Sequence, residues 1–509
     1  MFQHPNSRIK VGIENMKALV IGIDGASWNI IEKLKGMQIF SKKFIKQNAA
    51  YGVLESTIPP WSIPAWNAVF SGVKPKKMRL YSFIKRQGNS LTPVLRELDD
   101  QVYIWDLVSM HDGGVLVVNA PCVSRAISVN GYFVAGFLAD RSRLVFPSRL
   151  SKILNDYGYI VDVTDLHPLT DEEYLEVCLR ATLQKTAFFL ELSRRAKWRL
   201  GVIVYTHSDR IQHRFLKTRF SFVEKYYEVL DTCIARLLDR VGLDNTVVFM
   251  ISDHGFKIPK ATFSMNTWLI SRGYLSINSI SAKLRVVRIV EHTLSNSYVL
   301  LTAARKTAKI LRLTLHRNIQ RARREPTARM NLLRGAYMPS EDGTIYIINI
   351  ADKVRRVLAD RIAKEIKKSL PEIKVHRVAE IYGAALNRAP DLILESDSLA
   401  LSVDPALPLR LRTMRATHAR EGVFMAMGSQ RVVNLGFKGY AKVYDIAPTI
   451  LYVLGLPIPS YMDGHTLTKI FADNFIKHNK ESLIKITYEK ARIKSKIYRA
   501  LVSKVLSRT

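Results

Sequence analysis

The residues best able to do chemistry stand in five short segments, most of which follow an apolar run. Together these segments supply three carboxylates, three imidazoles and one hydroxyl. They are Asp24 in VIGIDG, Ser62 in IPPWSIPAW, Asp209 and His213 in VIVYTHSDRIQHRF, Asp253 and His254 in VVFMISDHGF, and His418 in MRATHAREGVFMAMG. This combination suits two adjacent divalent cations that share a substrate oxyanion. The set therefore indicates metal-assisted displacement at phosphorus.

Asp253 and His254 are neighbours at the end of an apolar run. Adjacent side chains at a strand end diverge, so a sharp turn is needed for both to reach one ion. Gly255 is expected to supply the backbone freedom for that turn. The alternative is a solvated turn in which Asp253 is only a cap.

Asp209 and His213 are four positions apart. If Ser208 or Asp209 caps a helix, both side chains lie on one face and can share a cation. The alternative is an ordinary helix cap followed by a surface histidine. His418, taken alone, is more often a surface histidine than a ligand, so its assignment depends on the other segments.

Ser62 stands where a short helix is expected to begin. Ser62 at the cap and Gly72 after the last turn predict a helix over 63–71. The free N–H groups at its N-terminus would face an oxyanion. A serine hydroxyl is a weak nucleophile until a metal or a base activates it. Ser56 and Thr57 are rival nucleophiles in the loop before this helix.

Five apolar, β-branched runs are expected to position these residues as buried strands. They are 17–23, 113–119, 199–206, 245–252 and 422–428. Helical patterns at 172–197 and 222–242 lie between them. This alternation predicts an α/β fold, with a mostly parallel sheet covered by helices on both faces. Each of the three carboxylates, Asp24, Asp209 and Asp253, stands just past the end of a predicted strand. All three are therefore expected at one edge of the sheet.

The pattern changes after residue 275. A basic, amphipathic stretch is followed by a predicted strand at 343–350, a helix at 354–370 and a strand at 373–383. We interpret 276–385 as an inserted α+β cap. The catalytic core is then 1–275 and 386–473, with the chain rejoining it at 390–395, and 474–509 is a basic helical tail.

Positive charge is concentrated in two segments. The chain carries 77 Lys and Arg against 44 Asp and Glu, a net charge of +33. Residues 283–334 hold 13 basic and 2 acidic residues, and 474–509 hold 10 and 2. Both segments have apolar residues at helical spacing, which suits an anionic membrane surface or nucleic-acid phosphates. The alternative is a solvated basic surface.

The sequence contains no apolar run of about 18 residues and no signal-peptide pattern, so no membrane span is expected. Cys122, Cys178 and Cys233 are too scattered for a disulfide framework or a thiolate metal cluster. We therefore expect a cytoplasmic protein, with a peripheral position at the inner membrane face as a second expectation.

These segments, in this order, resemble the alkaline phosphatase superfamily, and most closely its type I phosphodiesterase/nucleotide pyrophosphatase family. The resemblance spans 17–275 and 388–467. The motifs that carry it are VIGIDG, IPPWSIPAW with SGVKP, SDRIQHRF, SDHGF with NTWLISRGYL, THAREGVFMAMG, and DIAPTILYVLGLPIPSYMDG. The resemblance implies an alkaline-phosphatase-like core and a two-metal site.

In that family, the positions of Asp24, Ser62, Asp253 and His254 bind one metal. The positions of Asp209, His213 and His418 bind the other. The resemblance implies two divalent ions, with zinc expected and manganese or iron as alternatives. It also implies a phosphodiester or nucleotide as substrate. It does not indicate the oligomeric state.

Two departures from the family pattern concern the nucleophile and its surroundings. Relatives usually place threonine where this chain has Ser62, although either hydroxyl can attack phosphorus. Relatives also have a motif like KHGIFDF, whereas this chain reads KMRLYSF, with Met78 and Arg79 at the His-Gly positions. Arg79 is a candidate phosphate contact.

The expected function is metal-dependent hydrolysis of phosphoric esters, as a phosphodiesterase acting through a phosphoseryl intermediate on Ser62. A phosphomonoesterase of the same superfamily is the main alternative. A sulfatase is disfavoured because Trp66 stands where that family needs arginine, and a phosphoglycerate mutase because its serine segment differs. A non-catalytic protein that binds polyanions or membranes is the alternative from another class.

Overall fold

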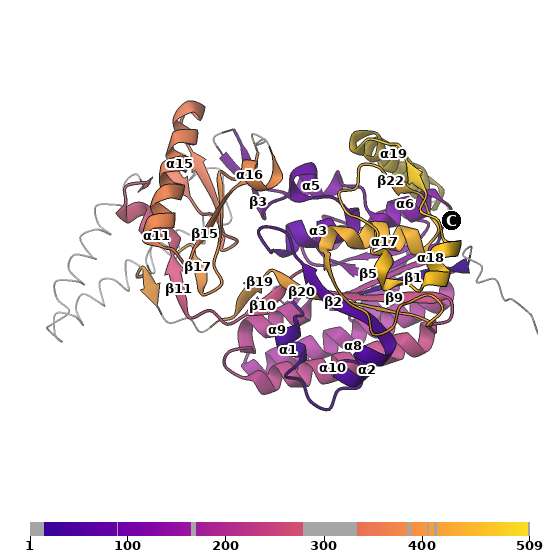
Figure 1. Cartoon of the computed structure of the whole chain (residues 1–509). Coiled ribbons are helices and arrows are strands. Elements are labelled where there is room, and N and C mark those ends of the chain that lie inside the picture. The colour runs from indigo at the N-terminus through magenta and orange to yellow at the C-terminus, as the bar shows by residue number, and fades with distance from the viewer. Residues whose placement is uncertain are drawn as a thin grey trace, which may run out of the picture. The chain divides into compact units, whose positions relative to one another are not determined.

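A computed structural model describes residues 15–88, 90–163, 169–277, 333–383, 388–404, 407–411 and 415–506. The chain divides into two compact units (Figure 1). The first unit comprises residues up to Lys74, Leu95–Phe256, and His418 onward. The second unit comprises Pro75–Val94 and Lys257–Thr417.

A nine-stranded sheet forms the centre of the first unit. Its order is β21 (Lys438–Lys442), β2 (Ala49–Glu55), β20 (Glu421–Met427), β9 (Thr246–Ile251), β1 (Lys17–Ile23), β8 (Leu200–Tyr205), β5 (Val115–Ala120), β6 (Gly131–Ala135) and β7 (Val145–Phe146). β20 runs antiparallel to both its neighbours, as does β7 to β6, and the other pairs are parallel. The predicted α/β fold with a mostly parallel sheet is confirmed.

The central strands have the composition that a sheet covered on both faces requires. In β1 every residue after Lys17 is buried, and all of β5, β8 and β9 is buried. A strand buried on both faces reads as a continuous apolar run, without the alternation of a half-exposed strand. For this reason the five predicted strands agree with the observed ones to within two residues.

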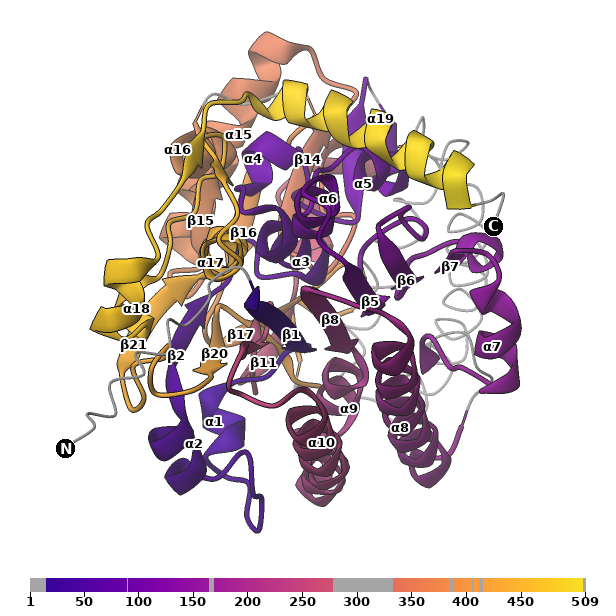
Figure 2. The same ribbon diagram turned by 90° about the vertical axis from the view of Figure 1, so that its right-hand side faces the viewer.

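Helices cover both faces of this sheet (Figure 2). On one face lie α8 (Asp171–Arg195), α9 (His207–Phe215) and α10 (Phe220–Val241). On the other lie α3 (Ser62–Ser71), α6 (Ile104–Met110) and α17 (Ile446–Val453). Thr170 and Glu173 form a capping box that fixes the start of α8 at Asp171, one residue before the predicted start.

The remaining elements of the first unit lie around this sandwich. They are α1 (Trp28–Ile31), α2 (Lys42–Asn48), α5 (Leu95–Asp99), α7 (Leu150–Asp156), α18 (Asp473–His478) and α19 (Tyr488–Leu506), the short strands β22 (Ile458–Pro459) and β23 (Leu483–Ile484), and 3₁₀ turns at Arg141–Arg143, Val443–Asp445 and Thr468–Ile470. Within the described part of the chain, no helix is long and apolar enough to cross a membrane.

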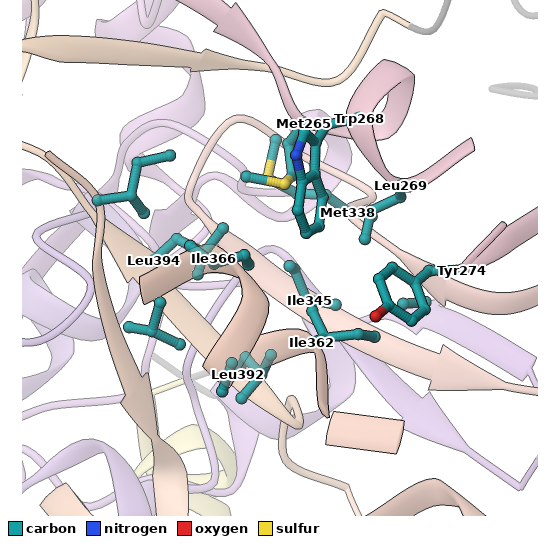
Figure 3. Close-up of a cluster of buried hydrophobic side chains, with 14 of the residues drawn as sticks. Met265, Trp268, Leu269, Tyr274, Met338, Ile345, Ile362, Ile366, Leu392 and Leu394 are labelled. Atoms are coloured by element: carbon teal, nitrogen blue, oxygen red, sulfur yellow. The ribbon is translucent and has the colours of Figure 1, made fainter. Parts of the chain in front are cut away.

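The second unit has its own antiparallel sheet. Its order is β12 (Leu275–Ile277), β13 (Leu333–Tyr337), β14 (Thr344–Ile348), β16 (Leu392–Glu395) and β15 (Lys374–Arg377). Helices α11 (Met265–Ser271) and α15 (Asp352–Ser369) contribute to a buried apolar cluster with this sheet (Figure 3). The unit also contains α4 (Pro75–Met78), α16 (Val378–Tyr382), β3 (Ile84–Gln87), β4 (Ser90–Pro93), β11 (Ala261–Ser264), β17 (Leu399–Ser402) and β18 (Arg410–Leu411).

Two sequence-based assignments in this unit are wrong. Residues 390–395 do not rejoin the catalytic core, because β16 pairs with β14 and β15 of the second sheet. The predicted strand at 373–383 ends at Arg377, where α16 begins. An apolar run such as LILE fits any buried sheet, so its periodicity did not identify its partner strands.

The domain division predicted from the sequence stays a prediction over much of its length, because 278–332 lie outside the described residues. The second unit differs from the predicted cap in two ways: its longer segment starts at Lys257 instead of residue 276, and it also includes Pro75–Val94. The expected basic tail contains α18, β23 and α19, which belong to the first unit.

Ile362 is expected to be essential to the second unit, because its side chain is fully buried in the cluster of Figure 3. We expect Ile362→Ala to lower the free energy of unfolding by roughly 2–5 kcal/mol. Val357→Ala is the matched control on the same helix, since Val357 is 67% exposed. Urea unfolding followed by fluorescence measures both variants, and equal shifts would contradict the assignment of this core.

Candidate functional site

Three carboxylates lie at the carboxyl edge of the central sheet, each beyond one strand. Asp24 follows β1 directly, Asp253 follows the end of β9, and Asp209 is in α9, which follows β8. The register sets the ends of these three strands side by side. All three residues are at most 3% exposed. The structure therefore brings them together at one sheet edge, as the strand pattern predicts.

Helix α9 begins earlier than the sequence suggests. Its first residue is His207 and its N-cap position is Thr206, so the expectation that Ser208 or Asp209 caps it is wrong. The Ser208 hydroxyl instead donates to carbonyl oxygens of the neighbouring strand ends, at 2.7 and 2.8 Å. The consequence drawn from the spacing still holds, since Asp209 Oδ1 and His213 Nε2 are 3.4 Å apart on one helix face.

His418 completes this first group of side chains. It belongs to β19 (Thr417–Ala419), and its Nε2 lies 3.2 Å from Asp209 Oδ1 and 2.9 Å from His213 Nε2. In a tetrahedral zinc site with bonds of about 2.0–2.2 Å, neighbouring ligand atoms are about 3.3–3.6 Å apart. The three atoms are therefore close to the separation that one ion requires.

A second group surrounds His254, which is fully buried. Its Nε2 lies 3.6 Å from Asp24 Oδ1, 3.3 Å from Asp253 Oδ2 and 3.5 Å from Ser62 Oγ. The ring of His254 stacks on that of His418, with centroids 3.7 Å apart, so the two groups adjoin. Oxygen atoms of Asp24 and Asp209 and a nitrogen of His254 are also close enough to share an ion. All seven residues proposed from the sequence thus meet in one place.

Two of the imidazoles are oriented by the backbone. Nδ1 of His418 lies 3.2 Å from the carbonyl oxygen of Pro60, and Nδ1 of His254 lies 3.2 Å from that of Gly255. A proton on each Nδ1 is donated to these carbonyls, which leaves the lone pair of each Nε2 directed into the cluster. This second hydrogen bond is the usual way that a protein fixes a metal-ligating histidine.

Each of the three carboxylates also has one oxygen atom that accepts no hydrogen bond and lies in the same cluster. Oδ1 of Asp24, Oδ1 of Asp209 and Oδ2 of Asp253 are buried and accept no hydrogen bond. Buried polar atoms are nearly always paired, because an unpaired one costs about 1–3 kcal/mol. Carboxylate oxygens and imidazole lone pairs that face one another need a cation between them, so these residues fit a metal site.

The pKa values follow from this crowding. Burial raises the pKa of Asp24, and the nearby Asp253 and Asp209 raise it further. Burial, followed by Asp209, raises the pKa of Asp253 to about 8. Burial would also raise the pKa of Asp209, but His213, His418 and Arg210 together hold it below its ordinary range. A bound cation would favour the ionised form of all three carboxyls.

The imidazole of His254 is held neutral. Burial lowers its pKa well below 6.5, and the neighbouring His418 lowers it further. A neutral imidazole is the form that binds a metal ion.

Ser62 opens helix α3. Trp61 is at the N-cap position, so the helix starts one residue earlier than predicted, and it ends at Gly72, whose φ of 71° is left-handed. The first turn of a helix has N–H groups without partners inside the helix. The Ser62 hydroxyl therefore lies between His254 and a helix N-terminus suited to an oxyanion. The rival Thr57 hydroxyl donates to the Pro59 carbonyl, 2.8 Å away.

Two glycines allow close packing around the cluster. Gly25 has a φ of 72°, and its N–H donates to Asp253 Oδ1 at 3.3 Å. A Cβ at Gly255 would lie 2.0 Å from the carbonyl oxygen of Glu421. Gly255 is therefore required for this close approach. The sequence led us to expect a glycine that frees the backbone for a sharp turn, but Gly255 has no left-handed φ.

Three residues to which the sequence assigned no role in supporting the acids are Trp66, Arg210 and Asp162. The indole N–H of Trp66 donates to Asp24 Oδ2 at 3.1 Å. Arg210 donates to Asp209 Oδ2 at 2.9 Å and to both oxygens of Asp162, at 2.9 and 3.2 Å. Trp66 and Arg210 adjoin proposed ligands in the quoted motifs and could have been found there. Asp162 comes from a loop that carries no sequence signal.

Arg79 belongs to the second unit, directly after α4, and has a φ of 61°. The adjacent Met78 is buried. The cluster described above lies wholly in the first unit, so the role of Arg79 as a phosphate contact stays a prediction.

Comparison with known protein families gives one match, which covers most of the chain. Residues 18–418 match the family model described as type I phosphodiesterase/nucleotide pyrophosphatase. No curated protein matches the chain in sequence.

Solved structures share the fold at low sequence identity. Murine ectonucleotide pyrophosphatase/phosphodiesterase 5 is 11% identical, with a TM-score of 0.54, and the match covers 90% of this chain and 100% of that one. The human protein of the same name is 10% identical, with a TM-score of 0.52 and the same coverage. The alkaline phosphatase PafA is 12% identical, with a TM-score of 0.55, over 90% of this chain and 99% of that one. These likenesses show an alkaline-phosphatase-like fold.

Asp162 is expected to affect metal binding without being a ligand. Asp162→Asn removes the charge that holds Arg210, so Arg210 will pull on Asp209 and disturb its carboxylate. We expect zinc affinity to fall about 10–100-fold, as for other residues that support metal ligands. Calorimetric titration of metal-stripped protein measures this. Asp473→Asn, an exposed control, should bind zinc normally, and unchanged affinity in Asp162→Asn would contradict the positioning role.

Proposed function

The chain belongs to the type I phosphodiesterase/nucleotide pyrophosphatase family, and on that premise we propose that it hydrolyses phosphoric diesters or nucleotides with Ser62 as the nucleophile. The observation that carries the proposal is the cluster of buried acceptors around the Ser62 hydroxyl. Three carboxylate oxygens there have no hydrogen-bond partner, and the lone pairs of two imidazoles face them. A two-cation phosphoester site accounts for all of these groups together.

The metal ligands in this proposal form two sets. They are Asp209, His213 and His418 for one cation, and Asp24, Ser62, Asp253 and His254 for the other. Histidine and carboxylate ligands suit zinc, and manganese or iron could use the same set. When bound, such cations polarise the phosphoryl group and lower the pKa of a hydroxyl beside them.

Ser62 carries the covalent step. Its Oγ loses its proton and attacks phosphorus in line with the leaving oxygen. The Oγ–P bond forms as the bond from phosphorus to the leaving oxygen breaks, and the leaving alcohol takes up a proton. Water then attacks the phosphorus bound to Oγ and the P–Oγ bond breaks. The product departs as the phosphate monoester that carries the water oxygen, and Oγ regains a proton from that water. The N–H groups at the start of α3 can stabilise the charge on the non-bridging oxygens.

The family description supports a diester or nucleotide as the substrate. One similar structure is described as murine ectonucleotide pyrophosphatase/phosphodiesterase 5 in an inactive form with threonine replaced by alanine, in complex with AMP. We propose that Ser62 takes the role of that hydroxyl here. A phosphomonoesterase is the second candidate, because the alkaline phosphatase PafA shares the fold with a comparable TM-score.

The position of the Trp66 side chain argues against sulfatase activity. A sulfatase needs arginine at this position, where it would face the substrate. Here the Trp66 side chain is fully buried, and its indole N–H is used by Asp24. The position therefore supports a ligand and cannot offer a positive charge to a sulfate ester.

Ser62→Ala should abolish turnover of bis-p-nitrophenyl phosphate, because it removes the hydroxyl that lies 3.5 Å from His254 Nε2 at the start of α3. We expect a fall of about a thousandfold or more. Ser62→Thr should keep most of the activity, since it keeps the hydroxyl. The rate is measured on metal-stripped protein resupplied with zinc or manganese, beside p-nitrophenyl phosphate as the monoester.

Ser56→Ala is the control, because it removes a nearby hydroxyl that the proposal does not use. Full activity in this variant and none in Ser62→Ala would support the assignment. Retained turnover in Ser62→Ala would overturn it. Faster turnover of the monoester would favour the phosphomonoesterase.

A further inference from the structure

Helix α19 is fixed to the first unit by polar contacts along one face. Arg499 donates to both oxygens of Asp106 in α6, at 2.6 and 2.7 Å. The Asp106 side chain is fully buried in this pair. The Tyr498 hydroxyl donates to the Ser109 carbonyl at 2.8 Å. These contacts set the rotation of the helix, and α19 lies across α6 in Figure 2.

Another side of α19 presents a row of aliphatic side chains to solvent. Ile493, Ile497, Leu501 and Val505 follow one another at intervals of four, which places them along one line on the helix. They are 60%, 55%, 58% and 62% exposed. Single exposed aliphatic residues are ordinary, but a contiguous row indicates a surface that is covered by something else.

The row continues into an apolar cavity of about 450 Å³ between α19, α6 and the β22–β23 pair. Ile497 and Leu501 belong both to the row and to the cavity wall, and Ile484 lines its other side. Next to Ile484, Leu483 is 68% exposed. The exposed apolar surface therefore extends beyond one helix. We call it the α19 surface: Leu483, Ile484, Ile493, Ile497, Leu501 and Val505 with this cavity.

Lysines share this face with the aliphatic row. Lys490 and Lys494 are exposed, and each precedes a member of the row by three positions. Lys485 is exposed beside Ile484. A helix with exposed aliphatic side chains among lysines suits the boundary between lipid headgroups and acyl chains, because the lysine stems can lie along the apolar layer while their ammonium groups reach the headgroups.

We propose that the α19 surface binds anionic phospholipid bilayers. Its aliphatic row would enter the headgroup boundary, and its lysines would contact acidic headgroups. This inference goes beyond the catalytic proposal and does not depend on it, because none of the residues involved belongs to the site around Ser62.

Two other occupants fit the surface less well. Nucleic acid would use the lysines but would leave the aliphatic row exposed to water. A second copy of the chain would bring two lysine-bearing faces of strongly basic molecules together, and like charges repel. An anionic bilayer satisfies the aliphatic and the basic groups at once.

Flotation of the full chain with lipid vesicles tests the proposal. We expect binding to vesicles of phosphatidylcholine mixed with phosphatidylserine, and about tenfold weaker binding to phosphatidylcholine alone. Substituting Ile493→Ser, Ile497→Ser and Leu501→Ser together should weaken binding to the mixed vesicles by about a hundredfold. Lys490→Gln with Lys494→Gln should weaken it by about tenfold.

Val354→Ser with Val357→Ser is the matched control, since both residues are exposed aliphatics on a helix of the second unit. The control should float like the wild type, and circular dichroism should show all variants folded. The proposal fails if the wild type does not float, if the triple variant floats normally, or if light scattering shows a dimer that the triple variant abolishes. Binding of an RNA oligonucleotide that the triple variant retains, without vesicle binding, also overturns it.

Discussion

Repulsion among three buried carboxylates is the constraint on which the first unit depends. Asp24, Asp209 and Asp253 meet where water is excluded, so their charges cannot be screened by solvent. A chain can hold such groups only by fixing them on rigid elements and surrounding them with donors. The central strands, the N–H of Gly25 and the guanidinium of Arg210 do this. Three carboxyl groups held together in this way, beside three imidazoles, form a group of side chains that could hold metal ions.

The same constraint explains why the supporting groups are asymmetric. Asp209 has Arg210 and two histidines beside it, so it stays ionised, whereas Asp24 and Asp253 face each other with fewer positive neighbours. Asp209 is thus already ionised before a cation binds, whereas Asp24 and Asp253 must lose protons when one binds. A site built in this way couples ion binding to proton release.

The fold of the first unit and the identity of its site residues could be read from the sequence because both depend on local patterns. The run VVFMIS is short, rich in β-branched residues and followed by a turn, which favours a buried strand, and an acid that follows such a strand is expected at the sheet edge. Prediction from the sequence failed for features that depend on contacts between residues far apart in the chain. Residues 390–395 form a strand that fits either sheet, and the close approach of Glu421 to Gly255 involves backbones far apart in the sequence. The contact of Asp162 with Arg210 is of the same kind.

The order of the chain has a consequence for biosynthesis. Strand β2 is made early, but both of its neighbours in the sheet, β20 and β21, follow the entire second unit. Until they emerge from the ribosome, β2 has two unpaired edges, and the candidate metal ligand His418 has only just been made. Such long-range pairing folds slowly and exposes strand edges in the nascent chain. The chain therefore completes its set of candidate metal ligands late in translation, at a stage when the second unit already has every residue of its own core.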